Sequence, residues 1–194
     1  MAAVGERGKN GRRGPARRFL HLCAPVLLVY YAIPDDCWIG VPKRVALLVI
    51  LVAVLLAELL RLVLRADLPE LRPYERAQVS AYAWASFAYA LAFLFFDPAL
   101  VVPVILGMAW IDPLCSFSRK HEIYPVAPLA AYVLLMAVAL WLVSGYGPAR
   151  VIVLSMVGGA VEIASEYPKL GFMDDDFAMV FFPLLALSLV NLVF

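Results

Sequence analysis

Seven carboxylates within or at the edge of long apolar runs are the side chains of this sequence best suited to chemistry. They are Glu58, Asp112, Glu162, Glu166, Asp174, Asp175 and Asp176. A carboxylate at membrane depth costs several kcal/mol unless it is paired, hydrated or bound to a metal, so by default it marks a functional site. Such groups, with cations nearby, suit an enzyme that brings a charged soluble donor to a lipid acceptor.

The sharpest segment runs from Trp110 to His121. Asp112 and Pro113 lie where an apolar run ends, and Arg119 and Lys120 follow seven and eight positions after the aspartate. We expect Pro113 to break the helix, since freed backbone at membrane depth is tolerated only where it lines a hydrated cavity. A carboxylate, hydroxyls and two cations suit a magnesium-nucleotide pocket. The alternative is a helix cap followed by ordinary basic residues at a membrane boundary.

A basic pair and a histidine open the first apolar segment. His21 lies three residues after Arg18 and four after Arg17, so all three can share one helix face. One interpretation is a cationic clamp for phosphate or pyrophosphate. The other is a pair of arginines extended toward the membrane surface, beside a histidine hydrogen-bonded within the bundle.

Further acidic groups lie near the C-terminal end of the chain. Glu162 and Glu166 are four residues apart and share a helix face, and Gly158 and Gly159 allow a neighbouring helix to approach closely. The three aspartates 174–176 precede the last apolar run. Because adjacent carboxylates repel one another, packing them requires cations, and we expect at least one to coordinate a metal.

A mixed-charge triad lies in the second apolar run. Glu58, Arg61 and Arg65 have the spacing i, i+3 and i+7, which places them on one helix face. We expect an internal ion pair that offsets the desolvation of Glu58.

The composition predicts an all-α, polytopic membrane helix bundle. The 194 residues are 64% hydrophobic with a mean hydropathy of +0.88, whereas soluble domains average roughly 45–50% apolar residues. A helix needs about 20 residues to cross a membrane, and about seven such segments are predicted. They are Phe19–Pro34, Val45–Leu64, Ala77–Phe96, Ala99–Leu114, Tyr124–Ser144, Val151–Glu166 and Phe177–Phe194.

The basic residues predict that the N-terminus is cytoplasmic. With that orientation, thirteen of the sixteen lysines and arginines fall on the inner side. Residues 1–16 are expected to form a flexible basic tail that contacts anionic lipid rather than nucleic acid, and residues 17–194 to form one transmembrane domain. We therefore expect an integral multi-pass protein, of a prokaryotic cell membrane, whose active site faces the cytoplasm.

Taken in their order along the chain, these segments resemble motifs of the polyprenol kinase family. This family includes dolichol kinases, phytol kinases and CTP-dependent diacylglycerol kinases, and is allied to phosphatidate cytidylyltransferases. The Arg17–His21 segment resembles its Arg-Lys-x-x-His motif, and the Ile111–Cys115 segment is similar to Gly-Asp-Pro/Ala-Leu-Ala. Glu162 and the Asp174–Asp176 segment resemble a glutamate on the penultimate helix and an Asp-Asp-Asn segment that opens the last. The resemblance covers most of residues 17–194.

The resemblance implies phosphoryl transfer from CTP to the hydroxyl of a polyprenol or related lipid alcohol, with Mg²⁺ or another divalent cation. On this hypothesis Asp112 or Glu162 is the catalytic group that accepts the alcohol proton. Metal ligands are expected at Asp112, Asp175 and Asp176. The residues expected to bind the nucleotide and its phosphates are Arg17, Arg18, His21, Arg119 and Lys120.

The chain departs from the family pattern in three places. Ile111 stands where the family has glycine, Asp176 stands where it has asparagine, and a Lys-Ser-x-Glu-Gly segment expected after Lys120 is missing. Three other functions therefore stay open. They are a cytidylyltransferase-like synthase of CDP-lipids, a carrier that uses the membrane carboxylates as a proton relay, and a non-catalytic relative that binds lipid.

Overall fold

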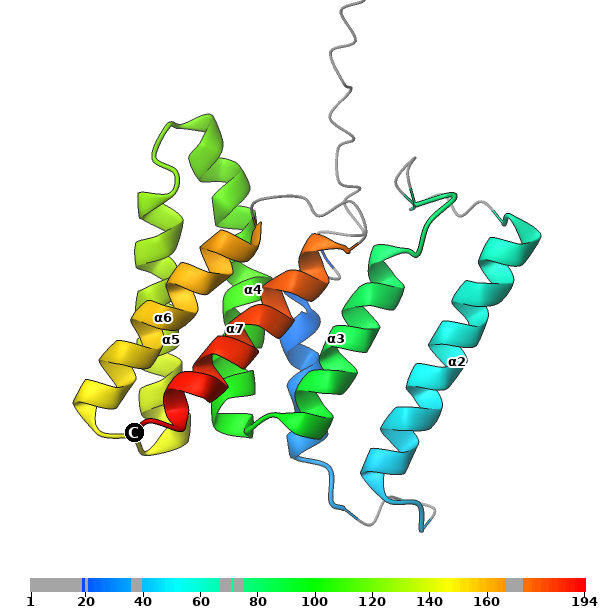
Figure 1. Ribbon diagram of the computed structural model, residues 1–194, viewed down its shortest axis with the longest axis horizontal. Coiled ribbons are helices and arrows are strands. Elements are labelled where there is room, and N and C mark those ends of the chain that lie inside the picture. The colour runs from blue at the N-terminus through cyan, green and yellow to red at the C-terminus, as the bar shows by residue number, and fades with distance from the viewer. Residues whose placement is uncertain (1–18, 20, 36–39, 67–70, 72–74, 167–172) are drawn as a thin grey trace, which may run out of the picture.

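In the computed structural model (Figure 1), the chain is an all-helical bundle. The structure describes residues 19, 21–35, 40–66, 71, 75–166 and 173–194, and within these ranges it contains seven helical elements and no strand. The elements are η1 (Ala24–Tyr31), α2 (Lys43–Leu64), α3 (Ala81–Phe95), α4 (Pro98–Lys120), α5 (Val126–Ser144), α6 (Pro148–Glu166) and α7 (Asp175–Asn191). The predicted fold class is confirmed to this extent.

Four of these helices, α2, α4, α5 and α6, are long and apolar enough to cross a membrane. The helices α3 and α7 are shorter, with 15 and 17 residues. The first predicted segment differs most, because its central part is an eight-residue 3-10 helix, η1. Pro25 occupies the first turn of η1, where a missing backbone N–H costs little, and Pro34 follows the element.

The prediction that Pro113 breaks the helix is wrong. The helix α4 continues through both Pro103 and Pro113 to Lys120. A proline inside a helix removes one backbone donor, and a kinked helix tolerates this where its neighbours hold it in place. Here α4 packs against η1, α3, α5 and α7, so tertiary contacts override the local signal.

Small residues let the central helices approach one another. A Cβ atom at Gly107 of α4 would collide with the ring of Tyr132 on α5. At Gly158 of α6, the added atom would collide with Met136 and lie 3.4 Å from Leu187. The close approach predicted for the paired glycines of α6 is therefore confirmed. These contacts join α4, α5, α6 and α7 into the core, which is lined by fully buried side chains such as Ile105.

The helix α2 lies at the edge of the bundle, beside α3 (Figure 1). A buried polar cluster holds it there: Arg61 donates to both oxygens of Glu58, at 3.0 and 2.8 Å, and to the carbonyl of Gln78 at 2.7 Å. Glu58 also accepts the backbone N–H of Ser80 at 2.6 Å. The predicted ion pair is confirmed, but Arg65 takes no part in it and ends the helix in a left-handed conformation.

Candidate functional site

Most of the predicted site residues lie at one end of the bundle. Successive long helices run in alternating directions, so the ends of α4 and α6 lie at the same end as the starts of α3 and α7 (Figure 1). The described residues brought to this end are His21, Asp112, Arg119, Lys120, Glu162, Asp175 and Asp176. Arg17 and Arg18 lie outside the described residues, and the structure tests neither.

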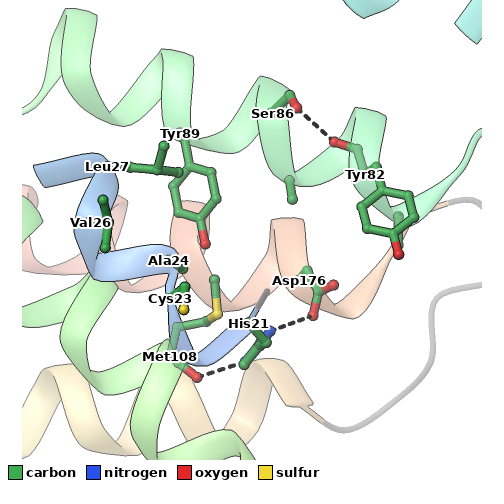
Figure 2. A pocket seen from close by; sticks show the side chains of 12 residues that line it. His21, Cys23, Ala24, Val26, Leu27, Tyr82, Ser86, Tyr89, Met108 and Asp176 are labelled. Carbon is green, nitrogen blue, oxygen red and sulfur yellow. Dashed lines mark hydrogen bonds and ion pairs between the residues drawn. The ribbon is translucent and has the colours of Figure 1, made fainter. Parts of the chain in front are cut away.

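His21 is the point where three elements meet. Its Nε2 atom lies 3.0 Å from the carbonyl oxygen of Met108 and 3.4 Å from Oδ2 of Asp112, both on α4. Its Nδ1 atom lies 3.9 Å from Oδ1 of Asp176, on the first turn of α7 (Figure 2). Both ring nitrogens therefore face oxygen atoms. The imidazole connects the segment before η1 with two carboxylates whose positions in the sequence are 64 residues apart.

Asp112 is almost completely buried, with 1% of its surface exposed. It lies two turns before the end of α4, and the continuation of the helix past Pro113 fixes its direction relative to Arg119. The predicted cluster of Asp112 with the basic pair is thus spread along about two turns of one helix.

Glu162 is as deeply buried as Asp112, with 1% exposure. Neither of its oxygens meets the geometry of a hydrogen bond within the described residues. The hydroxyl of Tyr132 lies nearby, but it donates to the carbonyl of Val104 at 3.4 Å. Glu162 interacts electrostatically with Asp112 and Glu166. A carboxylate in this position is costly, which is typical of a group retained for function.

The aspartate triplet forms the start of α7. Asp174 caps the helix and accepts the backbone N–H of Asp176 at 3.1 Å. One oxygen from each of Asp174, Asp175 and Asp176 lies within 4.8 Å of the others, close enough for a shared cation. Burial first, and then the charges of Asp176 and Asp175, raise the pKa of Asp174 to about 8. A divalent cation would relieve this repulsion between oxygen ligands of the type that Mg²⁺ prefers.

Arg119 does not extend freely into solvent. It forms an ion pair with Glu166 of α6, with 2.5 Å between Nη2 and Oε1, and its guanidinium lies 4.7 Å from the centre of the Tyr124 ring. The Tyr124 hydroxyl donates to the other oxygen of Glu166 at 3.3 Å, and burial raises the pKa of this hydroxyl. Lys120 is exposed beside this group. The predicted phosphate-binding arginine therefore has a carboxylate partner here.

An apolar pocket of about 430 Å³ lies beside His21. Side chains of η1 and α3 form its walls, and Met108 of α4 and Asp176 of α7 complete it (Figure 2). The polar groups, His21 and Asp176, lie together at one end, and the Tyr89 ring projects from α3 toward η1. Small-molecule sites share this combination of apolar walls and a few convergent polar groups.

Reasoning from the sequence missed this pocket and the partners of Arg119. The pocket depends on how η1 packs against α3, which no motif encodes. The sequence offers only a weak indication that Arg119 pairs with Glu166. A buried acid and a cation at the membrane boundary each need a counter-charge, but their spacing does not show that they meet. Tyr124, which follows the basic pair closely and precedes an apolar run, gave no signal of its role.

Comparisons with known proteins found no match to this chain among protein-family models, curated proteins or solved structures.

Proposed function

We propose that this protein is a membrane kinase that transfers a phosphoryl group from a nucleoside triphosphate to the hydroxyl of a lipid alcohol. The observation that carries the proposal is the convergence of Asp112 and Asp176, from two different helices, on His21 at the edge of an apolar pocket. Phosphoryl transfer depends mainly on positioning and charge neutralisation. This arrangement would position the reacting hydroxyl beside a space for lipid, and a bound cation would supply the neutralisation.

A divalent cation fits the acidic groups. The carboxylates of the triplet offer three oxygens within 4.8 Å of one another, and hard cations such as Mg²⁺ prefer carboxylate ligands. Asp175 and Asp176 would hold the ion together with Asp174. Asp112 does not belong to this cluster of described residues; it faces Nε2 of His21, whereas Asp176 faces Nδ1. When bound, the ion would neutralise charge on the transferred phosphoryl group.

The basic residues at the end of α4 would hold the donor. Lys120 is exposed, and Arg119 is 42% exposed at its side chain while pairing with Glu166. A nucleotide phosphate competes for a guanidinium in the same bidentate manner as a carboxylate. We therefore propose that Arg119 exchanges Glu166 for phosphate when the donor binds.

The proton of the alcohol would pass to the pair of His21 and Asp112. His21 lines the pocket, and Asp112 contacts the imidazole from α4 at 3.4 Å. As the hydroxyl oxygen bonds to the terminal phosphorus, its proton moves to an imidazole nitrogen and the bond to the bridging phosphate oxygen breaks. The products are a lipid phosphate and a nucleoside diphosphate. Glu162 remains the second candidate for accepting the proton, through Asp112.

Substitution of Asp112 tests the proposal. Purified protein in detergent, with magnesium, radiolabelled CTP or ATP and a polyprenol, should yield labelled lipid phosphate. We expect Asp112→Asn to lower the rate by about 100-fold or more, the usual range for a group that assists proton transfer. The matched control is Asp97→Asn, because Asp97 caps the opposite end of the same helix. Equal rates for wild type and Asp112→Asn would remove Asp112 from the chemistry.

The nucleotide product separates this activity from CDP-lipid synthesis. A kinase releases a nucleoside diphosphate, whereas a cytidylyltransferase releases pyrophosphate. Labelled pyrophosphate, from a lipid phosphate acceptor, would replace the proposed kinase with the second activity. A comparison of CTP, ATP, GTP and UTP in the same assay identifies the donor base.

A further inference from the structure

We propose that the pocket between η1 and α3 binds the hydrocarbon chain of a single-chain lipid alcohol, which enters from the bilayer and places its hydroxyl beside His21 and Asp176. The inference rests on the proposed function for the nature of the reacting group. It adds the location of the acceptor, its route of entry and the number of its chains.

The wall of the pocket on η1 is apolar and open to the surroundings. Val26 and Leu27 line the pocket, yet they remain 69% and 45% exposed. In a membrane protein, such side chains contact lipid rather than water. A hydrocarbon chain can therefore move into the pocket sideways from the bilayer, without crossing an aqueous phase. A water-soluble ligand would have to enter past these apolar side chains.

The opposite wall is formed by α3, where small side chains alternate with two tyrosines. Ala81, Ala85 and Ser86 leave space that longer side chains would fill, and the wall also includes Tyr82 and Tyr89. The volume of about 430 Å³ lies near the lower end of the roughly 300–1,000 Å³ typical of small-molecule sites. This space suits the part of one chain nearest the hydroxyl. The volume accommodates part of one chain, so we expect a single-chain alcohol to bind in preference to a diacylglycerol.

The polar end of the pocket suits an uncharged hydroxyl. His21 and Asp176 lie there (Figure 2). Asp112 faces Nε2 of the imidazole, the nitrogen that does not face Asp176. A hydroxyl can donate to one of these groups and expose its oxygen to a phosphoryl donor. An anionic headgroup such as a fatty-acid carboxylate would be repelled by the two carboxylates. An amine would be attracted to them, so a long-chain amine is a necessary competitor in the test.

Photolabelling tests the location. The full chain in detergent, without nucleotide, is irradiated with a long-chain primary alcohol that carries a diazirine in its tail, and the adducts are mapped by mass spectrometry. We expect adducts on η1 at Val26 or Leu27 and on α3 near Ala85. The unlabelled alcohol should compete, whereas a diacylglycerol should not. Labelling confined to other surfaces, or equal competition by a diacylglycerol or a long-chain amine, would overturn the assignment.

A filled pocket supplies the matched variants. Ala85→Phe projects a ring into the space, and we expect labelling of η1 to fall by about ten-fold, as for a modest steric misfit in an apolar site. Val138→Phe is the control, because it places a ring in a different apolar groove, between α5 and α6. If Ala85→Phe does not fold, Ser86→Leu serves instead, since the Ser86 hydroxyl bonds only the Tyr82 carbonyl of its own helix, at 2.8 Å. Undiminished labelling in the folded variant contradicts the proposal.

The two proposals fail in distinguishable ways. Labelling in the pocket without any nucleotide-dependent transfer would remove the kinase activity and leave a lipid-alcohol site. Transfer that proceeds at the wild-type rate in folded Ala85→Phe protein would retain the kinase and place its acceptor elsewhere.

Discussion

Glu162 shows at the scale of one residue how function and stability oppose each other. Its carboxylate is enclosed, with 1% exposure, and neither oxygen has a hydrogen bond among the described residues. Replacing a buried polar group with an apolar one of similar shape is often neutral or stabilising, whereas a polar group left unsatisfied lowers stability. Glu162 is thus a group whose burial lowers stability and which is the second candidate for accepting the proton in the proposed reaction.

We expect Glu162→Met to raise the free energy of unfolding by about 1–2 kcal/mol while lowering phosphoryl transfer, a trade-off found in many active sites. Thermal unfolding in detergent and the transfer assay measure the two effects. Glu166→Met is the control one turn along the same helix. It leaves Arg119 without its carboxylate partner, so it should not gain stability. A lower unfolding temperature for Glu162→Met would show that the carboxylate is satisfied in the folded protein.

Charged residues that need a partner could be identified from the sequence more easily than the side chains that they contact. The ion pair of Glu58 with Arg61 followed from their spacing on one helix, and the structure confirms it. The meeting of His21 with Asp112 and Asp176 did not follow from any spacing, because the three side chains come from separate elements. Such contacts depend on helix packing, which local patterns do not encode.

At the scale of the elements, glycines decide how closely the core helices pack. Gly107 of α4 leaves the space that the Tyr132 ring of α5 occupies. We expect Gly107→Ala to lower the free energy of unfolding by about 1–3 kcal/mol, the usual range for overpacking a core. The control is Gly147→Ala, whose added atom meets nothing within 4 Å. Thermal unfolding of both variants tests this, and equal midpoints would mean that Tyr132 moves aside without cost.

Apolar runs predicted where the helices are, but not how they end. A helical element overlaps each of the seven predicted segments, yet α4 extends six residues beyond the predicted Leu114. The error came from Pro113, whose local preference is outweighed by packing of α4 on four neighbours. The opposite difference affects the first segment, where the apolar stretch predicts a long α-helix and the described residues 24–31 form the 3-10 helix η1.

At the scale of the molecule, the orientation in the membrane stays a prediction from the basic residues. Lys120 lies at the site end of the bundle, and Ala149 lies at the opposite end, where α6 begins. In a background without native cysteines, we expect Lys120→Cys to react with an impermeant maleimide only after intact cells are permeabilised. Ala149→Cys should react from outside. The reverse pattern would place the site on the outer face and exclude a cytoplasmic donor.

The depth of Asp112 within α4 has a consequence for the surrounding bilayer. Asp112 lies eight residues before the last residue of α4, which is about 12 Å along the helix axis. Asp112 and the first turn of α7 both contact His21, so they lie at a similar depth. The helix α7 has 17 residues and is about 26 Å long, whereas the hydrocarbon core of a bilayer is about 30 Å thick. Hydrophobic mismatch of this kind is relieved by local thinning of the lipid.

Thinning at the start of α7 would lower the headgroups and water toward the carboxylates, so that a charged nucleotide need not enter hydrocarbon. We therefore expect the transfer rate in reconstituted vesicles to fall as the acyl chains of the host phospholipid lengthen. A short, water-soluble alcohol should show the same trend as acceptor, because the effect concerns access of the nucleotide rather than of the lipid. A rate independent of acyl-chain length would contradict this. If the expected trend holds, acyl-chain length sets the transfer rate through the mismatch between the short helix α7 and the thicker hydrocarbon of the bilayer.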